Sequence, residues 1–159
     1  MTLHLSLKEK WFRMIQSGEK REEYREITPY WMKRLCYLLV NRGDGWIDRY
    51  TMTEGEARNV IEHLDEDLRN GNIEMRSFTD VHFTLGYPKA DDAARHMTRQ
   101  IADITIGTGR PEWGAVEGKQ YFVIKLEPHQ RNEKERKYET RSKSNQSDLR
   151  RMRSDVRDT

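Results

Sequence analysis

The octet Gly18-Glu19-Lys20-Arg21-Glu22-Glu23-Tyr24-Arg25 carries the decisive signal of this chain, because it places a glycine turn and charges of both signs between a predicted helix and a predicted strand. Alternate side chains of an extended segment share a face, so Glu23 and Arg25 should point the same way. Lys20 lies next to the turn and can be aimed at them independently. A lysine, a carboxylate and an arginine in one cleft suit a phosphate or the polar edge of a base. The alternative is a solvated hairpin face on which these charges form surface ion pairs.

The segment before the octet predicts a strand and then a helix. Leu3 and Leu5 alternate with polar residues as in a strand, and Ser6-Leu7-Lys8-Glu9 has the pattern of a capping box. In the helix that follows, Trp11 is expected in the core, because its helical neighbours are apolar. Gly18 can adopt the left-handed conformation that closes this helix.

The segment after the octet predicts further helices mixed with strands. Thr28-Pro29 marks a helix start, with Thr28 as the cap. Residues 53–56 repeat the capping-box pattern before one amphipathic helix that ends at Gly71. A short helix is expected over residues 90–97, and strands over residues 78–85, 101–106 and 121–126. Because the elements do not alternate regularly between strand and helix, an α+β fold is predicted.

The octet, written as Gly-x-Lys-x-x-Glu-x-Arg after a strand and a helix, resembles the signature of the ASCH domain, a branch of the PUA-like superfamily. Residues 29–31 and 79–87, and the segment Pro111-Glu112-Trp113-Gly114-Ala115, also look like small ASCH proteins of bacteria and their phages. The resemblance covers about residues 2–127. It implies a PUA-like small β-barrel with flanking helices and a cleft where the octet meets the barrel, with a helical insertion at about residues 42–76.

The resemblance also implies a function, because ASCH proteins are linked to RNA and to modified nucleosides. We therefore expect the cleft to bind RNA above all, or another nucleic acid, a nucleoside or a nucleotide. The expected ligand-binding residues are Lys20, Glu23, Tyr24 and Arg25. Trp113 joins them as an aromatic face on which a base can stack. The alternative for Trp113 is packing over the end of the barrel, and Tyr30 and Trp31 are expected to form a lid.

A second hypothesis is a hydrolase in which Lys20 and Glu23 are catalytic. In the ASCH branch that hydrolyses N4-acylated cytidines, the motif lysine works with a threonine three residues later, a position that Glu23 occupies here. This departure removes the hydroxyl nucleophile of that branch. In a ribonuclease branch the lysine works with a distant serine, and Ser77 is the serine before the tail that is far from Lys20 in sequence. A third hypothesis is a regulatory module that binds another protein through the insertion and the tail.

The charges of the chain are unevenly distributed. The formal net charge is +2, but residues 129–159 contain ten Lys and Arg against six Asp and Glu. This segment has few large apolar residues, so a basic, disordered tail is predicted after a folded domain of residues 1–128. Within the tail, residues 147–156 could form a short basic amphipathic helix against RNA or a partner.

Composition excludes several classes of protein. No stretch approaches the roughly 18 apolar residues of a membrane-spanning helix, and no signal peptide is visible. The single cysteine, Cys36, excludes an intramolecular disulfide framework, fits a reducing cytoplasm and is expected to be buried. The five histidines have no neighbouring cysteines, so no structural zinc site and no cofactor are expected.

Overall fold

A computed structural model describes residues 1–128, so the predicted tail and its segment 147–156 lie outside the described residues. The fold is α+β. Its strands are β1 (Thr2–Leu7), β2 (Glu22–Glu26), β3 (Cys36–Asn41), β4 (Ile47–Tyr50), β5 (Ile73–Met75), β6 (Asp80–Leu85), β7 (His96–Thr108) and β8 (Gln120–Leu126). Its α-helices are α1 (Glu9–Ser17), α2 (Pro29–Leu35), α3 (Glu54–Glu62) and α4 (Leu64–Asn70), and short 3₁₀ helices cover Ala93–Arg95 and Pro111–Trp113.

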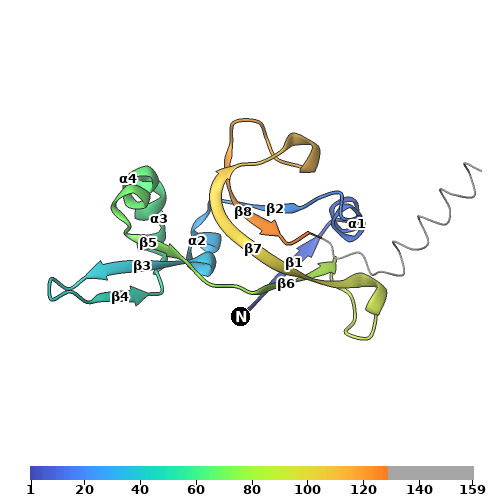
Figure 1. The fold of residues 1–159 in the computed structure, drawn as a ribbon, viewed down its shortest axis with the longest axis horizontal. Helices are drawn as coiled ribbons and strands as arrows, with labels where there is room; N and C mark the ends of the chain where they lie inside the picture. The colour runs from blue at the N-terminus through green and yellow to red at the C-terminus, as the bar shows by residue number, and fades with distance from the viewer. Residues whose placement is uncertain (129–159) are drawn as a thin grey trace, which may run out of the picture. The chain divides into compact units, whose positions relative to one another are not determined.

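The main sheet has five strands in the order β1-β6-β7-β8-β2. β1 and β6 are parallel, and the other neighbours are antiparallel. The sheet curls into a half-barrel, and the long arc of β7 accounts for most of the curl (Figure 1). A register shift between Ile101 and Asp103 interrupts the pairing of β7 with β8, and such irregularities increase strand bending. β1 and β2 are the two edges of this half-barrel.

Residues 42–76, the predicted insertion, contain α3, α4 and two strands of a second sheet with the order β4-β3-β5. The guanidinium group of Arg76 holds this region to α2. It donates to the carbonyl oxygens of Lys33 at 3.0 Å and Cys36 at 3.2 Å, and to the hydroxyl of Thr51 at 3.2 Å. It also lies 4.2 Å from the ring centroid of Tyr37. Arg76, which follows β5, therefore joins α2, the start of β3 and the segment that follows β4.

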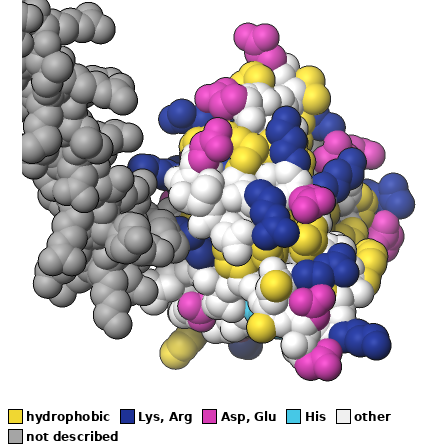
Figure 2. Space-filling model, turned by 90° about the vertical axis from the view of Figure 1, so that its right-hand side faces the viewer, with side chains coloured by type: hydrophobic (Ala, Val, Ile, Leu, Met, Phe, Trp, Pro, Cys, Tyr) yellow, Lys and Arg dark blue, Asp and Glu magenta, His cyan; other side chains and the backbone are white. Residues whose placement is uncertain are grey.

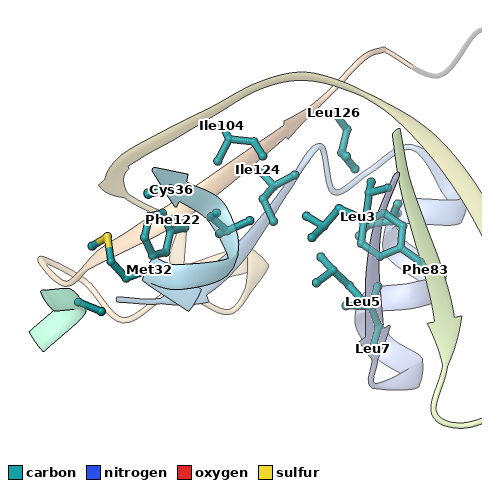
Figure 3. Packing of buried hydrophobic residues seen from close by; sticks show 14 of the residues in the cluster. Leu3, Leu5, Leu7, Met32, Cys36, Phe83, Ile104, Phe122, Ile124 and Leu126 are labelled. Carbon is teal, nitrogen blue, oxygen red and sulfur yellow. The ribbon is translucent and has the colours of Figure 1, made fainter. Parts of the chain in front are cut away.

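The core lies on the inner face of the half-barrel. Alternate residues of β1 point into it, where they meet the apolar side chains of β6 and β8 (Figure 3). The fully buried side chains include Phe12, Phe83, Phe122, Ile15, Met32 and Cys36. The expected burial of Cys36 is thereby confirmed, and burial raises the pKa of its thiol to about 12.

The structure corrects several expectations about the helices. Ser6 does not cap α1, because β1 continues to Leu7 and keeps Ser6 in register with Thr84. The N-cap residue of α1 is Lys8, whose side chain forms no capping hydrogen bond. Residues 90–97 form only a 3₁₀ turn, because β6 pairs with β7 from His96 onward.

The predicted helix ending at Gly71 is two helices. The capping box of Thr53 and Glu56 is confirmed at its start, and Gly71 closes α4 in the left-handed conformation. The chain breaks at His63, which ends α3 and precedes α4. The start of α2 at Thr28 and Pro29 is confirmed, since the Thr28 side chain accepts from the Trp31 amide. None of the helices in residues 1–128 is long and apolar enough to cross a membrane.

A second, smaller apolar cluster lies on the other face of β2 and β8. It consists of Tyr24, Ala115, Tyr121 and Val123, with Trp113 packed against it. Gly109 approaches this cluster so closely that a Cβ atom there would lie 2.6 Å from the Ala115 Cβ and 2.8 Å from the Tyr24 ring. Only glycine fits this position without movement of its neighbours.

We predict that Gly109→Ala lowers the free energy of unfolding by about 1–3 kcal/mol, because the added methyl group overpacks the cluster. Urea unfolding measures this change. Gly107→Ala is the matched control, since nothing lies within 4 Å of a Cβ atom there. Equal effects of the two substitutions would contradict the close approach at Gly109.

Candidate functional site

The octet forms the corner between α1 and β2. Gly18 ends α1 with φ 82°, and its amide donates to the carbonyl of Ile15 at 3.1 Å. The Lys20 amide then donates to the Met14 carbonyl at 3.0 Å, which fixes the start of the next segment against the helix. These backbone hydrogen bonds fix the direction in which the chain leaves α1, and with it the position of Lys20 before β2.

The register of β2 against β8 decides where the charges of the octet point. Glu23 is opposite Ile124 and Arg25 is opposite Phe122, and both partners belong to the main core. Opposite residues of an antiparallel pair share a face, so Glu23 and Arg25 point to the inner side of the half-barrel. Tyr24 pairs with Val123 on the other face. The predicted common face of Glu23 and Arg25 is confirmed.

Lys20, Glu23 and Arg25 form a buried ion triad. The Lys20 Nζ lies 2.5 Å from Glu23 Oε2, and Arg25 Nη1 donates to Glu23 Oε1. Lys20 is 2% exposed and Glu23 is 4% exposed, so both charges are removed from water. Each carboxylate oxygen has its own cation, which is the arrangement that offsets the cost of burial. The interpretation of the octet as a solvated surface is therefore wrong.

Aromatic rings enclose the ammonium group of Lys20. It lies 5.0 Å from the ring centroid of Trp11 and 5.2 Å from that of Tyr24. Burial lowers the pKa of Lys20, and the charge of Glu23 opposes this shift. A cation held against ring faces and one carboxylate is positioned firmly and is poorly hydrated.

Tyr24 serves as a fixed support on the outer side of the corner. Its hydroxyl donates to Glu22 at 2.7 Å and accepts from the Arg110 amide at 3.0 Å. Burial raises the pKa of this hydroxyl, so it stays protonated. The Arg110 guanidinium also lies 4.7 Å from the ring centroid of Trp113. Tyr24 thus ties β2 to the segment that presents Trp113.

Two arginines cover the free edge of β1. Arg25 Nη2 donates to the Ser6 carbonyl at 3.3 Å, and Arg34 Nη2 donates to the His4 carbonyl at 3.2 Å. Both guanidinium groups lie within 6 Å of the Trp31 ring centroid, at 5.3 and 5.6 Å. Side chains from β2 and α2 therefore occupy the place that a neighbouring strand would take.

A cleft of about 920 Å³ opens over the triad. All five sequence-predicted site residues line it: Lys20, Glu23, Tyr24, Arg25 and Trp113. The aromatic side chains that line the cleft besides these are Trp11, Tyr30, Trp31, Tyr87 and Tyr121. Sequence reasoning placed Trp11 in the core, but Phe12 takes that position, with 0% exposure. Trp11 and Phe12 are adjacent aromatic residues of α1, so the sequence alone does not decide which of them is buried.

Other expected or conceivable site groups do not join the cleft. Ser77 is exposed and is not among the residues that line it. Within residues 1–128, no three His, Cys, Asp or Glu side chains are arranged to hold a metal ion. The face of the molecule in Figure 2 carries basic and acidic side chains interspersed rather than a patch of one sign. The cleft is therefore the place in this part of the chain where the predicted site residues come together.

Comparison with known proteins adds no identification: no family model, no curated protein and no solved structure matches the chain. The function has to be inferred from the chemistry of the cleft.

We predict that Glu23→Gln destabilises the protein by about 3–5 kcal/mol, because it leaves two cations unpaired, one of them buried. Chemical unfolding of the variant and the wild type measures the change. The matched control on the same strand is Glu26→Gln, which removes an exposed pair with Lys119 and should cost less than about 1 kcal/mol. A small effect of Glu23→Gln, similar to that of Glu26→Gln, would show that the triad contributes little to stability.

Proposed function

We propose that this chain is an ASCH-type, PUA-like domain that binds single-stranded RNA by taking a base into the cleft. The observation that carries the proposal is the combination of aromatic rings and a buried ion triad around one open cavity. Aromatic faces bind the flat sides of a base, and fixed charges bind its polar edge.

The size and lining of the cleft suit a nucleoside. Its volume of about 920 Å³ lies in the range of about 300–1,000 Å³ that is usual for small-ligand pockets. Stacking of a base on an aromatic side chain contributes about 1–3 kcal/mol and depends little on the base. Trp31 and Trp113 are partly exposed and line the cleft, so both can offer such a face.

The three charges of the triad are not equally accessible. Both oxygens of Glu23 are occupied, and Lys20 is almost completely buried, whereas the Arg25 side chain keeps 16% of its surface exposed. Arg25 is therefore the member best placed to donate to a base or a phosphate. Lys20 and Glu23 position it, because Glu23 fixes one end of the guanidinium group.

The resemblance of the octet supports the choice of RNA. In the ASCH pattern the Gly-x-Lys-x-x-Glu-x-Arg motif borders the ligand cleft, and in this chain the same octet borders the cavity at the α1–β2 corner. A curled sheet with helices beside it is also compatible with a PUA-like barrel. Base stacking alone would serve DNA equally well, so the test compares both.

The test is fluorescence anisotropy with labelled single-stranded RNA and with DNA of the same sequence, using the full chain. We predict that Trp31→Ala weakens RNA binding about tenfold, since it removes a stacking face. Trp113→Ala gives a second probe in case the first variant folds poorly. Trp46→Ala is the matched control, because Trp46 is 71% exposed and lies outside the cleft. Absence of RNA binding, or equal losses in the variants and the control, would refute the proposal.

A second candidate function is hydrolysis of a modified nucleoside or of RNA. The observation that favours it is the lowered pKa of Lys20, caused by burial, together with its contact of 2.5 Å to Glu23. Such a pair can take a proton from water and pass it to a leaving group. With an N4-acylated cytidine, water would attack the acyl carbon and the C–N bond would break, giving cytidine and a carboxylic acid.

Incubation with N4-acetylcytidine and, separately, with RNA tests this candidate by chromatography of the products. Under this candidate, Lys20→Met abolishes turnover, whereas Lys10→Met, a change at an exposed residue of α1 outside the cleft, preserves it. No turnover by the wild type on either substrate would discard these two reactions. Turnover that survives Lys20→Met would remove Lys20 from the mechanism.

A further inference from the structure

The cleft does not end at the triad but continues across the edge of β1. Its lining includes His4, Ser6 and Thr84. The registers place His4 opposite His82 and Ser6 opposite Thr84, and the alternating residues Leu3 and Leu5 are buried in the core. His4, Ser6 and Thr84 therefore belong to the outer face of β1 and β6, beside the mouth of the cleft.

Three histidines stand in a row on this outer face: His4 on β1, His82 on β6 and His96 on β7. The ring centroids of His4 and His82 are 5.5 Å apart, and those of His82 and His96 are 5.2 Å apart. No local sequence pattern joins them, because parallel pairing of β1 with β6 brings together residues far apart in the chain.

The hydrogen bonds of the row define the tautomers of the neutral rings of two of its members. His96 Nε2 lies 2.9 Å from the Lys89 carbonyl, which can only accept, so this nitrogen carries a hydrogen. In the neutral ring His96 Nδ1 then accepts from His82 Nε2 at 3.0 Å. His82 Nδ1 in turn accepts from the Thr98 hydroxyl at 3.0 Å. All four ring nitrogens of His82 and His96 are thus used inside the protein.

His4 differs from the other two. Its side chain is exposed and forms no hydrogen bond with any other residue of 1–128. Its one ring contact there is with His82. Its ring nitrogens are therefore open to a ligand from the cleft, whereas those of His82 and His96 are already used within the protein. Burial lowers the pKa of His82, and the neighbouring His4 and His96 lower it further. His4 is consequently the member of the row that can donate to a ligand.

A second cation is anchored at the same strand residue. Arg34 donates to the His4 carbonyl at 3.2 Å and to the Tyr30 hydroxyl at 3.0 Å. The carboxylates that line the cleft, Glu23 and Glu26, already form ion pairs. The other charged side chains that line the cleft are Lys8, Lys20 and Arg25. Cations outnumber anions in this set, which favours an anionic ligand.

We propose that His4 and Arg34 bind the phosphate group attached to the nucleoside whose base occupies the cleft. This inference rests on the proposed function, and it specifies the ligand as a nucleotide unit with its phosphate at the edge of β1. A guanidinium group forms charge-assisted hydrogen bonds to phosphate oxygens, and the N–H group of an imidazole ring donates to them as well. The ligand would then cross from the aromatic, inner part of the cleft to the outer face of the sheet.

Calorimetric titration of the full chain with four nucleosides and with the four corresponding dinucleoside monophosphates tests this proposal. For the wild type we expect the dinucleotide to bind about tenfold more tightly than its nucleoside, because the phosphate adds charge-assisted hydrogen bonds. His4→Gln and Arg34→Gln should each reduce this preference, since each removes the imidazole or guanidinium group that contacts the phosphate.

His63→Gln and Arg58→Gln are the matched controls, because both residues are exposed and lie on the α3–α4 region outside the cleft. They should keep the wild-type preference for the dinucleotide, and thermal unfolding confirms that each variant is folded. Equal affinity for nucleoside and dinucleotide, or a preference that persists in both His4→Gln and Arg34→Gln, would overturn the phosphate site while leaving base binding intact. Absence of binding by every probe would instead refute the proposed function.

Discussion

The candidate site depends on one carboxylate, that of Glu23, which is held between two cations inside the half-barrel. Burial of a charge is costly unless its partners are close and its hydrogen bonds are complete. Both conditions hold here, since no buried side-chain nitrogen or oxygen in the described residues lacks a hydrogen-bond partner. The carboxylate therefore fixes the positions of Lys20 and Arg25, and with them the corner between α1 and β2.

Arg25 connects this carboxylate to two further elements, β1 and α2. Its guanidinium group contacts Glu23 on its own strand, the Ser6 carbonyl on β1 and the ring of Trp31 on α2. The two edges of the half-barrel are thus joined by a side chain instead of a strand ladder. A contact through one side chain leaves open space between the two strands, whereas backbone hydrogen bonds between them would close that space. The same contacts that stabilise the edge consequently create the cleft.

Part of this arrangement could be predicted from the sequence, because it follows from local rules. The period of an extended segment placed Glu23 and Arg25 on one face, and the cap residues Thr28 and Thr53 marked helix starts that the structure confirms. The burial of the triad could not be predicted, since β8 is apolar on both faces and its sequence does not show which face Glu23 will meet. The break at His63 was equally hidden, because the apolar stripe continues through it.

The residues that sequence reasoning missed share a physical cause, which is long-range pairing. Trp11 lines the cleft because Gly114, from a distant segment, packs directly against its ring; a Cβ atom at Gly114 would lie 2.7 Å from it. His4 and His82 meet only through the parallel pairing of β1 and β6, which no turn or local pattern specifies. The local structure of the octet determines the positions of Lys20 and Arg25. Which residues surround them is determined by strand pairing and packing between segments that are far apart in the chain. The octet alone therefore predicts a charged corner, whereas the aromatic residues of the cleft and the histidines beside it follow only from the fold.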